Sequence, residues 1–441
     1  MNKKTENKAV SPWQWVPSLY FAQGLPYVVV MSVAVILFKR MGMSNTDIAL
    51  YTSGLNLPWV IKPLWSPLVD LLKTKRWWIV VMQILVGAGL AGIALTIQGP
   101  LAFRYCLAFM WLLAFSSATH DIAADGFYML GLNEKKQAYF VGIRSTFYRF
   151  AVIFGQGILV MFAGWLEQRY AREMPETAAI PQAWSLTFYL LTILFALLFV
   201  YHYLFLPHPR RDTCTLPPQQ ASAGRVFKEF LGTFTSFFQK KHIVSALIFI
   251  LLYRFAEAQL VKITSPFLLD TPATGGLALS TAEVGFIYGT IGVIALTIGG
   301  IVGGIAMARR GLKSCLWTMT IAMNLPNIVY LYLSFARPES IGIISGCVAI
   351  EQFGYGFGFT SLTYFMMLFS NGKHQTAHYA ICTGFMALGL MLPGMISGWI
   401  EESIGYRAFF VWIMLCTIPS FWATHLVRKN LTDNHSDNSS R

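Results

Sequence analysis

Runs of about twenty apolar residues recur along the chain, and they constrain its fold more than any other feature. Two of them, WWIVVMQILVGAGLAGIALTI (77–97) and AWSLTFYLLTILFALLFVYHYLFL (183–206), contain no Asp, Glu, Lys or Arg. A helix of that length spans the hydrocarbon core of a bilayer. Charged residues make up only 12% of the chain, against about 25% in soluble domains. The sequence therefore predicts an all-α protein that crosses a membrane many times.

Breaks between the apolar runs predict twelve membrane-spanning helices. Their approximate ranges are 15–38, 46–70, 77–98, 101–131, 137–165, 184–206, 242–268, 281–307, 313–335, 340–370, 375–400 and 406–427. Basic residues gather in alternate loops, most densely in residues 207–241. Because cytoplasmic loops are enriched in Lys and Arg, both termini and this loop are expected in the cytoplasm. The net charge of +13 then suits anionic lipid headgroups, and no nucleic-acid partner is predicted.

Two short motifs recur at nearly the same spacing in the two halves of the chain. SNTDIALY (44–51) resembles STAEVGFIY (280–288), and GWLE (164–167) matches GWIE (398–401). In the first pair a Ser is followed three positions later by an acid, which is the capping-box pattern of a helix start. The loops PLVDLLKTKR and GIAMARRGLK lie at a similar offset.

This repeat predicts two six-helix halves, residues 1–206 and 242–441, with a substrate site at their interface. Residues 207–241 are expected to form a cytoplasmic linker. Its second part, RVFKEFLGTFTSFFQKK (225–241), has the apolar and basic pattern of an interfacial helix.

Charged residues inside the predicted spans are the candidate functional residues. A lone charge at the centre of a membrane helix costs about 2.5–3.5 kcal/mol on insertion scales, so it needs a partner or a water-filled path. Asp121 and Asp125 lie one turn apart in the fourth span, and their depths match those of Arg149 and Arg144 in the fifth. The pairs Asp125–Arg144 and Asp121–Arg149 are therefore expected. They form either a fixed ladder of ion pairs or a gate and proton relay, because a second acid opposes ionisation of the first while Arg favours it.

Four further charged residues are placed on the transport path: Lys62, Arg254, Glu257 and Glu351. Lys62 lies between two prolines, where a broken backbone is expected beside protein or a cavity. Arg254 and Glu257 are three positions apart and can pair locally. Glu351 precedes three glycines that permit close approach of helices.

An enzyme is the main alternative class, and it rests on His120. His120 and Asp125 fit the H-x-x-x-x-D spacing of glycerolipid acyltransferases, but they lie in the body of a span rather than at an interface. No HExxH, GxSxG or GxxxxGKS motif is present, so the sequence does not support a zinc protease, a serine hydrolase or a P-loop nucleotide-binding protein. The chain is therefore predicted not to be an enzyme. An acyltransferase and a non-transporting sensor stay minor alternatives, and no cofactor or metal site is predicted.

Several motifs resemble a branch of the major facilitator superfamily that contains AmpG-type muropeptide permeases and the acetyl-CoA transporter of the endoplasmic reticulum. HDIAADGFYML (120–130) is similar to the branch signature Q-D-I-A-x-D, with His120 in place of Gln. LPWVIKPLWSPLVD (57–70) resembles its second span, and LYRFAEA (252–258) and IEQFGYGFG (350–358) resemble spans seven and ten. The resemblance extends over roughly residues 17–425.

The resemblance implies proton-driven import of 1,6-anhydro-muropeptides or related amino sugars by a monomer in the bacterial inner membrane. Efflux of a drug-like compound or another metabolite is the alternative within transport. The residues that the resemblance places along the path are Lys62, Asp121, Asp125, Arg149, Glu257 and Glu351.

The superfamily's loop signature, Gly-x-x-x-Asp-Arg-x-Gly-Arg-Arg, is partly kept after spans two and eight. In the first copy Asp70, Lys75 and Arg76 keep the acid and the basic end. In the second, Arg309 fits, but Ala308 stands where the acid is expected. The resemblance implies that these charges form a cytoplasmic latch in which the first copy carries the acid.

Overall fold

The computed structural model describes residues 11–209, 212, 232, 234–371 and 375–438. Every regular element within these residues is a helix, and eight helical segments are long and apolar enough to cross a membrane. The chain is therefore an all-α, multi-pass membrane protein, as predicted. The count of twelve spans stays a prediction.

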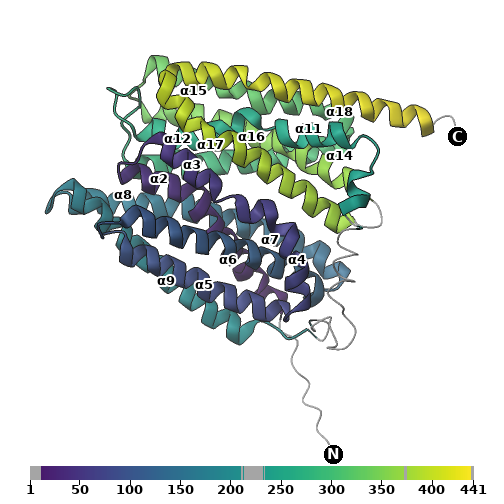
Figure 1. The fold of residues 1–441 in the computed structure, drawn as a ribbon, viewed down its shortest axis with the longest axis horizontal. Coiled ribbons are helices and arrows are strands. Elements are labelled where there is room, and N and C mark those ends of the chain that lie inside the picture. The colour runs from purple at the N-terminus through teal and green to yellow at the C-terminus, as the bar shows by residue number, and fades with distance from the viewer. Residues whose placement is uncertain (1–10, 210–211, 213–231, 233, 372–374, 439–441) are drawn as a thin grey trace, which may run out of the picture. The chain divides into compact units, whose positions relative to one another are not determined.

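The helices follow the predicted spans closely along the chain (Figure 1). Their bounds are α1 Val16–Val28, α2 Ala34–Arg40, α3 Asn45–Gly54, α4 Leu57–Leu71, α5 Lys75–Thr96, α6 Ala102–Gly131, α7 Glu134–Val152, α8 Leu159–Tyr170, α9 Glu176–Phe205, α11 Ile243–Leu252, α12 Phe255–Leu269, α13 Thr281–Val284, α14 Val293–Asn324, α15 Ile328–Ala336, α16 Ile341–Phe369, α17 Gln375–Leu415 and α18 Thr417–Asn438. Three π-helical turns, η2 Val29–Val33, η3 Ile153–Ile158 and η4 Gly285–Gly292, continue α1, α7 and α13.

Two helical segments are about twice the length that crosses a bilayer. They run over Thr281–Ala336, with 56 residues, and Ala377–Lys429, with 53 residues. Each contains a glycine with positive φ, Gly311 at 71° and Gly405 at 75°. Glycine adopts this conformation without a Cβ penalty, so the helix direction can change there. Both breaks fall where the sequence predicts a boundary between spans.

The predicted helix starts at the repeated Ser motifs are confirmed. Ser280 Oγ accepts from the Glu283 backbone N–H, and Glu283 Oε2 accepts from the Ser280 N–H at 2.7 Å, which completes a capping box. Ser44 Oγ accepts from the Asp47 N–H at 3.0 Å. Such caps satisfy backbone donors that have no partner within the helix.

The chain divides into two compact units. The first consists of the described parts of Met1–Val28, Trp65–Phe154 and Trp184–Gln220. Within it α5 packs along α6 (Figure 1), and α1 packs along α6 and α7. Its core contains Trp15, Leu19, Phe127 and Phe140, all buried.

The second unit consists of the described parts of Val29–Leu64, Gly155–Ala183 and Ala221–Arg441. Within it α17 packs along both α3 and α12, and α14 packs along α16 (Figure 1). Its core includes Phe249, Tyr253 and Phe365. The two-half division at residues 206 and 242 differs from this division and stays a prediction.

The predicted interfacial helix over residues 225–241 lies partly outside the described residues. Residues 234–238 are helical. Phe237 is fully buried in the core of the second unit, and Ser236 Oγ lies 3.0 Å from His378 Nε2. Lys240 Nζ donates to the carbonyl oxygens of Phe369 and Asn371 at 2.6 and 2.9 Å. The described end of the linker therefore packs against the end of α16 and the start of α17.

Candidate functional site

The predicted pair Asp125–Arg144 is confirmed in the first unit. Arg144 Nη1 lies 3.5 Å from Asp125 Oδ1. Tyr20 joins them, because its hydroxyl donates to Asp125 Oδ1 at 3.1 Å and accepts from Arg144 Nη1 at 2.9 Å. The guanidinium also lies over the rings of Tyr20 and Tyr128, 4.8 and 5.0 Å from their centroids, which adds cation–π attraction. The side chains of Asp125 and Arg144 are 41% and 32% exposed, so this pair is only partly buried.

The second predicted pair, Asp121–Arg149, stays a prediction. Asp121 lies in α6 and Arg149 in the last turn of α7. Tyr148 interacts electrostatically with both of them and with Asp125. These charges therefore belong to one polar region of the first unit.

His120 belongs to a buried hydrogen-bond network rather than to a catalytic dyad. Its Nε2 lies 3.1 Å from Gln83 Nε2, and Gln83 also binds His202 Nδ1. His202 Nε2 in turn lies 3.0 Å from Ser18 Oγ. Gln83, His120 and His202 are at most 2% exposed. His120 and Asp125 have different partners, so the geometry of an acyltransferase dyad is not formed.

Replacing Gln83 with Ala is expected to lower the stability of the protein. The substitution removes the hydrogen-bond partner that two buried imidazoles share, and an unsatisfied buried polar group costs about 1–3 kcal/mol. Thermal unfolding of the purified protein in detergent measures the effect as a lower Tm. Gln98→Ala is the matched control, because Gln98 is exposed. Equal Tm values for the two variants would contradict the role given to this network.

The second unit places two predicted acids, Glu257 and Glu351, in one buried cluster. They are 4% and 2% exposed and interact electrostatically. Glu351 Oε2 accepts from the Tyr330 hydroxyl at 3.1 Å and from Gln352 Nε2 at 3.0 Å. Within the described residues Glu257 Oε2 has no hydrogen-bond partner. The cluster therefore contains a buried carboxylate oxygen with unused capacity.

Arg254 lies beside this cluster, but the predicted local ion pair with Glu257 does not form. Arg254 Nη2 donates to the Tyr355 hydroxyl at 2.5 Å, and its guanidinium lies over the rings of Tyr355 and Phe359. The two residues interact electrostatically, but the local pair that their spacing allows is not a contact pair, because the helix is interrupted here. Arg254 is the N-cap of α12, with φ −106° and ψ 21°, so the i, i+3 geometry of a continuous helix does not hold.

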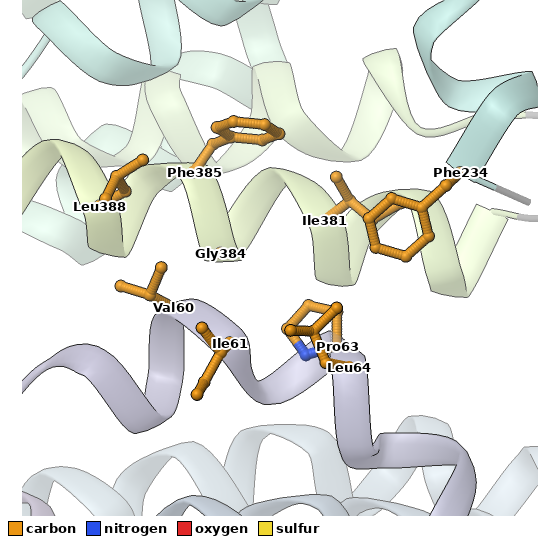
Figure 2. A pocket seen from close by; sticks show the side chains of 9 residues that line it. All are labelled: Val60, Ile61, Pro63, Leu64, Phe234, Ile381, Gly384, Phe385 and Leu388. Atoms are coloured by element: carbon orange, nitrogen blue, oxygen red, sulfur yellow. The ribbon is translucent and has the colours of Figure 1, made fainter. Parts of the chain in front are cut away.

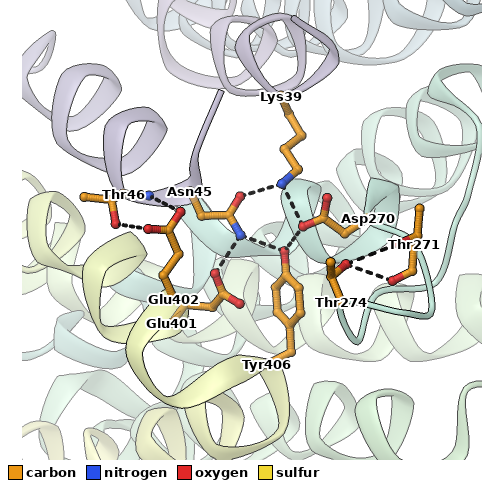
Figure 3. Close-up of polar contacts among 9 residues, drawn as sticks. All are labelled: Lys39, Asn45, Thr46, Asp270, Thr271, Thr274, Glu401, Glu402 and Tyr406. Carbon is orange, nitrogen blue, oxygen red and sulfur yellow. Dashed lines mark hydrogen bonds and ion pairs between the residues drawn. The ribbon is translucent and has the colours of Figure 1, made fainter. Parts of the chain in front are cut away.

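A polar cluster joins α2, α3, α12 and α17 at one end of the second unit (Figure 3). Lys39 Nζ binds Asp270 Oδ2 at 2.7 Å and Asn45 Oδ1 at 2.8 Å. Asn45 Nδ2 donates to Glu401 Oε2 at 2.6 Å and to the Tyr406 hydroxyl at 2.8 Å. The Tyr406 hydroxyl donates to Asp270 Oδ2 at 2.6 Å. We call these five residues the end cluster.

The other copy of the repeat has a corresponding set of contacts, again between a Gly-Trp-x-Glu motif and a helix start. Glu167 Oε2 accepts from Thr281 Oγ1 at 2.6 Å and from Arg40 Nε at 3.1 Å. Thr281 follows Ser280 as Asn45 follows Ser44. Glu167 is the last residue of GWLE, as Glu401 is of GWIE. Each Gly-Trp-x-Glu motif therefore contacts the helix start of the opposite copy. The sequence contains both motifs, but nothing in their spacing indicates this crossed pairing.

The glycines of these motifs bring the backbones into direct contact. A Cβ added to Gly398 would lie 1.9 Å from the Asn45 carbonyl oxygen, and one added to Gly164 would lie 2.3 Å from the Ala282 nitrogen. Small residues allow such close approach of membrane helices. At each of the two contacts, one helix backbone therefore touches the backbone of another helix.

Elsewhere in the second unit, α4 and α17 border a cavity of about 170 Å³ (Figure 2). The residues that line it all have apolar side chains or none: Val60, Ile61, Pro63, Leu64, Phe234, Ile381, Gly384, Phe385 and Leu388. In Figure 2 the side chain of Val60 points toward α17, whereas that of Ile61 points away from it. The helices α3 and α17 are therefore in direct contact at the end cluster, whereas α4 and α17 leave a cavity between them.

The remaining predicted residues are placed as follows. Lys62 is half-buried in α4, and the backbone is interrupted at residues 55–56, shortly before the first proline of this segment. The side chain of Asp70 lies outside the described residues. The backbone N–H groups of Lys75 and Arg76 donate to the carboxylate of Asp212 at 2.7 and 3.0 Å.

Arg309 is exposed and has no ion pair in the described part of the chain. Asp212, which the sequence did not single out, thus binds the basic end of the first loop. The latch between the halves stays a prediction.

Comparison with known proteins gives consistent matches over most of the chain. The model of the Major Facilitator Superfamily matches residues 18–377. The chain is 25% identical over 415 residues to the putative transporter AmpG 4 of Rickettsia conorii, covering 92% of this chain and 93% of that protein. It is 24% identical over 420 residues to the anhydromuropeptide permease of Escherichia coli strain K12, covering 94% and 79%.

Solved structures of transporters share the fold. The nucleoside transporter NupG superposes with a TM-score of 0.68 at 13% identity, covering 94% of this chain and 98% of that chain. A D-xylose-proton symporter gives a TM-score of 0.68 at 13% identity, covering 94% and 96%. At this identity the likeness shows the fold alone.

Proposed function

The chain belongs to the Major Facilitator Superfamily, and from that premise we propose that it imports 1,6-anhydro-muropeptides or related amino sugars by proton-coupled alternating access. It is a transporter of the facilitator type. The substrate class is supported by the relatives called anhydromuropeptide permease and AmpG, which align over more than nine-tenths of this chain. Efflux of another metabolite is the alternative that the test below addresses.

The observation that carries the proposal is the buried acid pair Glu257–Glu351. Two buried carboxylates repel each other when both are charged, so one bound proton stabilises the pair. Glu257 lies near the middle of the Ile243–Leu269 span, and one of its oxygens has no partner among the residues described. Uptake of a proton there from one side and its release to the other couples the gradient to transport. Asp125 is a second carboxylate that can bind a proton, and the neighbouring guanidinium of Arg144 favours its charged form.

The gate is formed by the end cluster and by its repeated counterpart at Glu167 and Thr281. Both sets must separate for this end to open, and both join the same two repeats. Residues 1–206 and 242–441 rock against each other as two halves, and the breaking of these contacts opens the site. These contacts are hydrogen bonds between buried or partly buried side chains. In such surroundings a hydrogen bond is stronger than in water. They stabilise the closed state without covalent links.

The transporter is placed in the bacterial inner membrane as a monomer, with both termini in the cytoplasm. The distribution of Lys and Arg among the loops supports this orientation. It puts the end cluster on the periplasmic side and Asp70, Lys75, Arg76 and Arg309 on the cytoplasmic side, where they form the latch.

Uptake into proteoliposomes tests the proposal. The probe is labelled N-acetylglucosaminyl-1,6-anhydro-N-acetylmuramyl tripeptide, supplied with an inward proton gradient and without one. We expect gradient-driven uptake by the wild type and a loss of about tenfold in Asp125→Asn, equivalent to about 1.4 kcal/mol in the barrier. Glu173→Gln is the control, because its carboxylate is a surface one that pairs with Arg169.

Uptake that ignores both the gradient and Asp125→Asn would refute proton coupling at this residue. Loss of preloaded probe from the vesicles, with no uptake, would favour efflux. Absence of movement in either direction would refute the muropeptide as substrate.

A further inference from the structure

Lys262 is a buried lysine in α12 that the function described so far does not use. It is 3% exposed, and its Nζ donates to Thr52 Oγ1 of α3 at 3.2 Å. An ammonium has three N–H donors. Within the described residues this hydroxyl is its single hydrogen-bond partner, so two donors have none.

No carboxylate in the described chain forms an ion pair with Lys262. The nearest acids along α12 are Glu257 and Asp270, about 7.5 and 12 Å away along the helix axis. Asp270 is already bound by Lys39 and by the Tyr406 hydroxyl. Glu257 interacts with Glu351 and Arg254. A buried ammonium without a counterion is strongly unfavourable, so an anion that reached this position would stabilise the charged form of Lys262.

Ser53 supplies a second unused polar group at the same place. Its side chain is fully buried, and its Oγ has no hydrogen-bond partner among the described residues. A Cβ added to Gly394 of α17 would lie 2.6 Å from Ser53 Oγ and 3.5 Å from Lys262 Cγ. The aliphatic part of the Lys262 side chain and the Ser53 hydroxyl therefore lie close together where α3, α12 and α17 pack. The contact that covers them is the same helix pair, α3–α17, that the gate must separate.

We propose that Lys262 and Ser53 bind a carboxylate of the transported substrate when α3 and α17 separate. This inference rests on the proposed function and names the charged group that the site selects. A single ammonium beside one hydroxyl suits a monoanionic carboxylate, whereas phosphate recognition usually employs several cations or the fork of an Arg. The site therefore distinguishes substrates with a free acid, such as the peptide part of a muropeptide, from their neutral amides.

Direct binding measurements on the full-length purified protein test the proposal. The two probes are the labelled anhydro-muropeptide and the same compound with its carboxylates amidated. We expect the wild type to bind the acid form at least about tenfold more tightly than the amide. Lys262→Gln is expected to abolish this preference by weakening the acid form alone, and Lys262→Arg to keep part of it. Lys313→Gln, at an exposed lysine of α14, is expected to change neither affinity.

Stability gives a second readout that a purely structural lysine would not produce. Removing a buried cation without a counterion relieves an unfavourable charge, so Lys262→Met is expected to keep or raise the Tm while losing the preference for the acid. A marked fall in the Tm of Lys262→Met would show that the lysine serves to hold the helices together, and would overturn the proposal.

The outcomes separate this inference from the proposed function. If the wild type transports the muropeptide but binds acid and amide equally, or if Lys262→Gln keeps the preference, the inference fails and the proposed function stands. If the wild type binds neither probe, the muropeptide assignment fails. The carboxylate site is then tested separately. The Tm shift that dipeptides, uronic acids and muramic acid cause is measured for the wild type and for Lys262→Gln. A shift lost in Lys262→Gln supports the carboxylate site, and no shift with any acid overturns it.

Discussion

Proton-driven accumulation of substrate is expected to fall about a hundredfold in Glu257→Gln, equivalent to about 2.7 kcal/mol. Gln has nearly the shape of Glu, but its amide does not take up and release a proton near neutral pH. Glu257 interacts with Glu351, and its Oε2 has no partner in the described part of the chain, so no neighbouring group replaces it there. Uptake into proteoliposomes with and without an inward proton gradient measures the effect.

Exchange of substrate between the two sides of the membrane, measured without a gradient, is the internal control for folding and binding. It is expected to persist in Glu257→Gln, because exchange requires no net proton movement. Glu339→Gln, at an exposed acid, is expected to leave both activities unchanged. Full gradient-driven uptake by Glu257→Gln would exclude this residue as the proton carrier. Equal loss of exchange and driven uptake would indicate a role in binding or folding instead.

Gly398→Leu is expected to prevent closure at the end cluster and to abolish uptake. Even a single Cβ at this position would lie 1.9 Å from the Asn45 carbonyl oxygen, so α3 and α17 must move apart. The hydrogen bond between Asn45 and Glu401 then breaks as well. A cysteine introduced at Thr46 in a protein lacking its six native cysteines reports the opening. Its reaction with a membrane-impermeant maleimide is expected to be at least about tenfold faster in Gly398→Leu, equivalent to about 1.4 kcal/mol.

Gly346→Leu is the matched control, because a Cβ there would meet nothing within 4 Å. The crossed pairing of the two repeated motifs leads to a second expected result. Gly164→Leu, which would collide with Ala282, is expected to have the same effect as Gly398→Leu. Unchanged labelling and uptake in Gly398→Leu would show that this contact is not a gate. An effect at Gly398 but none at Gly164 would show that the two contacts do not act as a pair.

Depth along a helix was enough to predict one of the long-range charge contacts. Asp125 and Arg144 lie on consecutive spans that run in opposite directions, so their distance from the shared loop fixes their relative height. Spacing within one helix was less informative for Arg254 and Glu257, because Arg254 is an N-cap rather than part of a continuous helix. Lys262 was missed, although a lysine in an apolar span is a signal in its own right.

The sequence by itself determined the membrane-spanning helices, most of their boundaries, the helix caps and the repeat. These features depend on neighbours within a few turns of the chain, where hydropathy, glycine and capping residues act directly. Only the tertiary structure decided which copies of the repeat touch. Asn45 and Glu401 lie 356 residues apart, and Lys262 and Ser53 come together only because Gly394 and Gly398 let α3 and α17 pack closely. Such contacts depend on how the helices pack in three dimensions, which the local pattern does not specify.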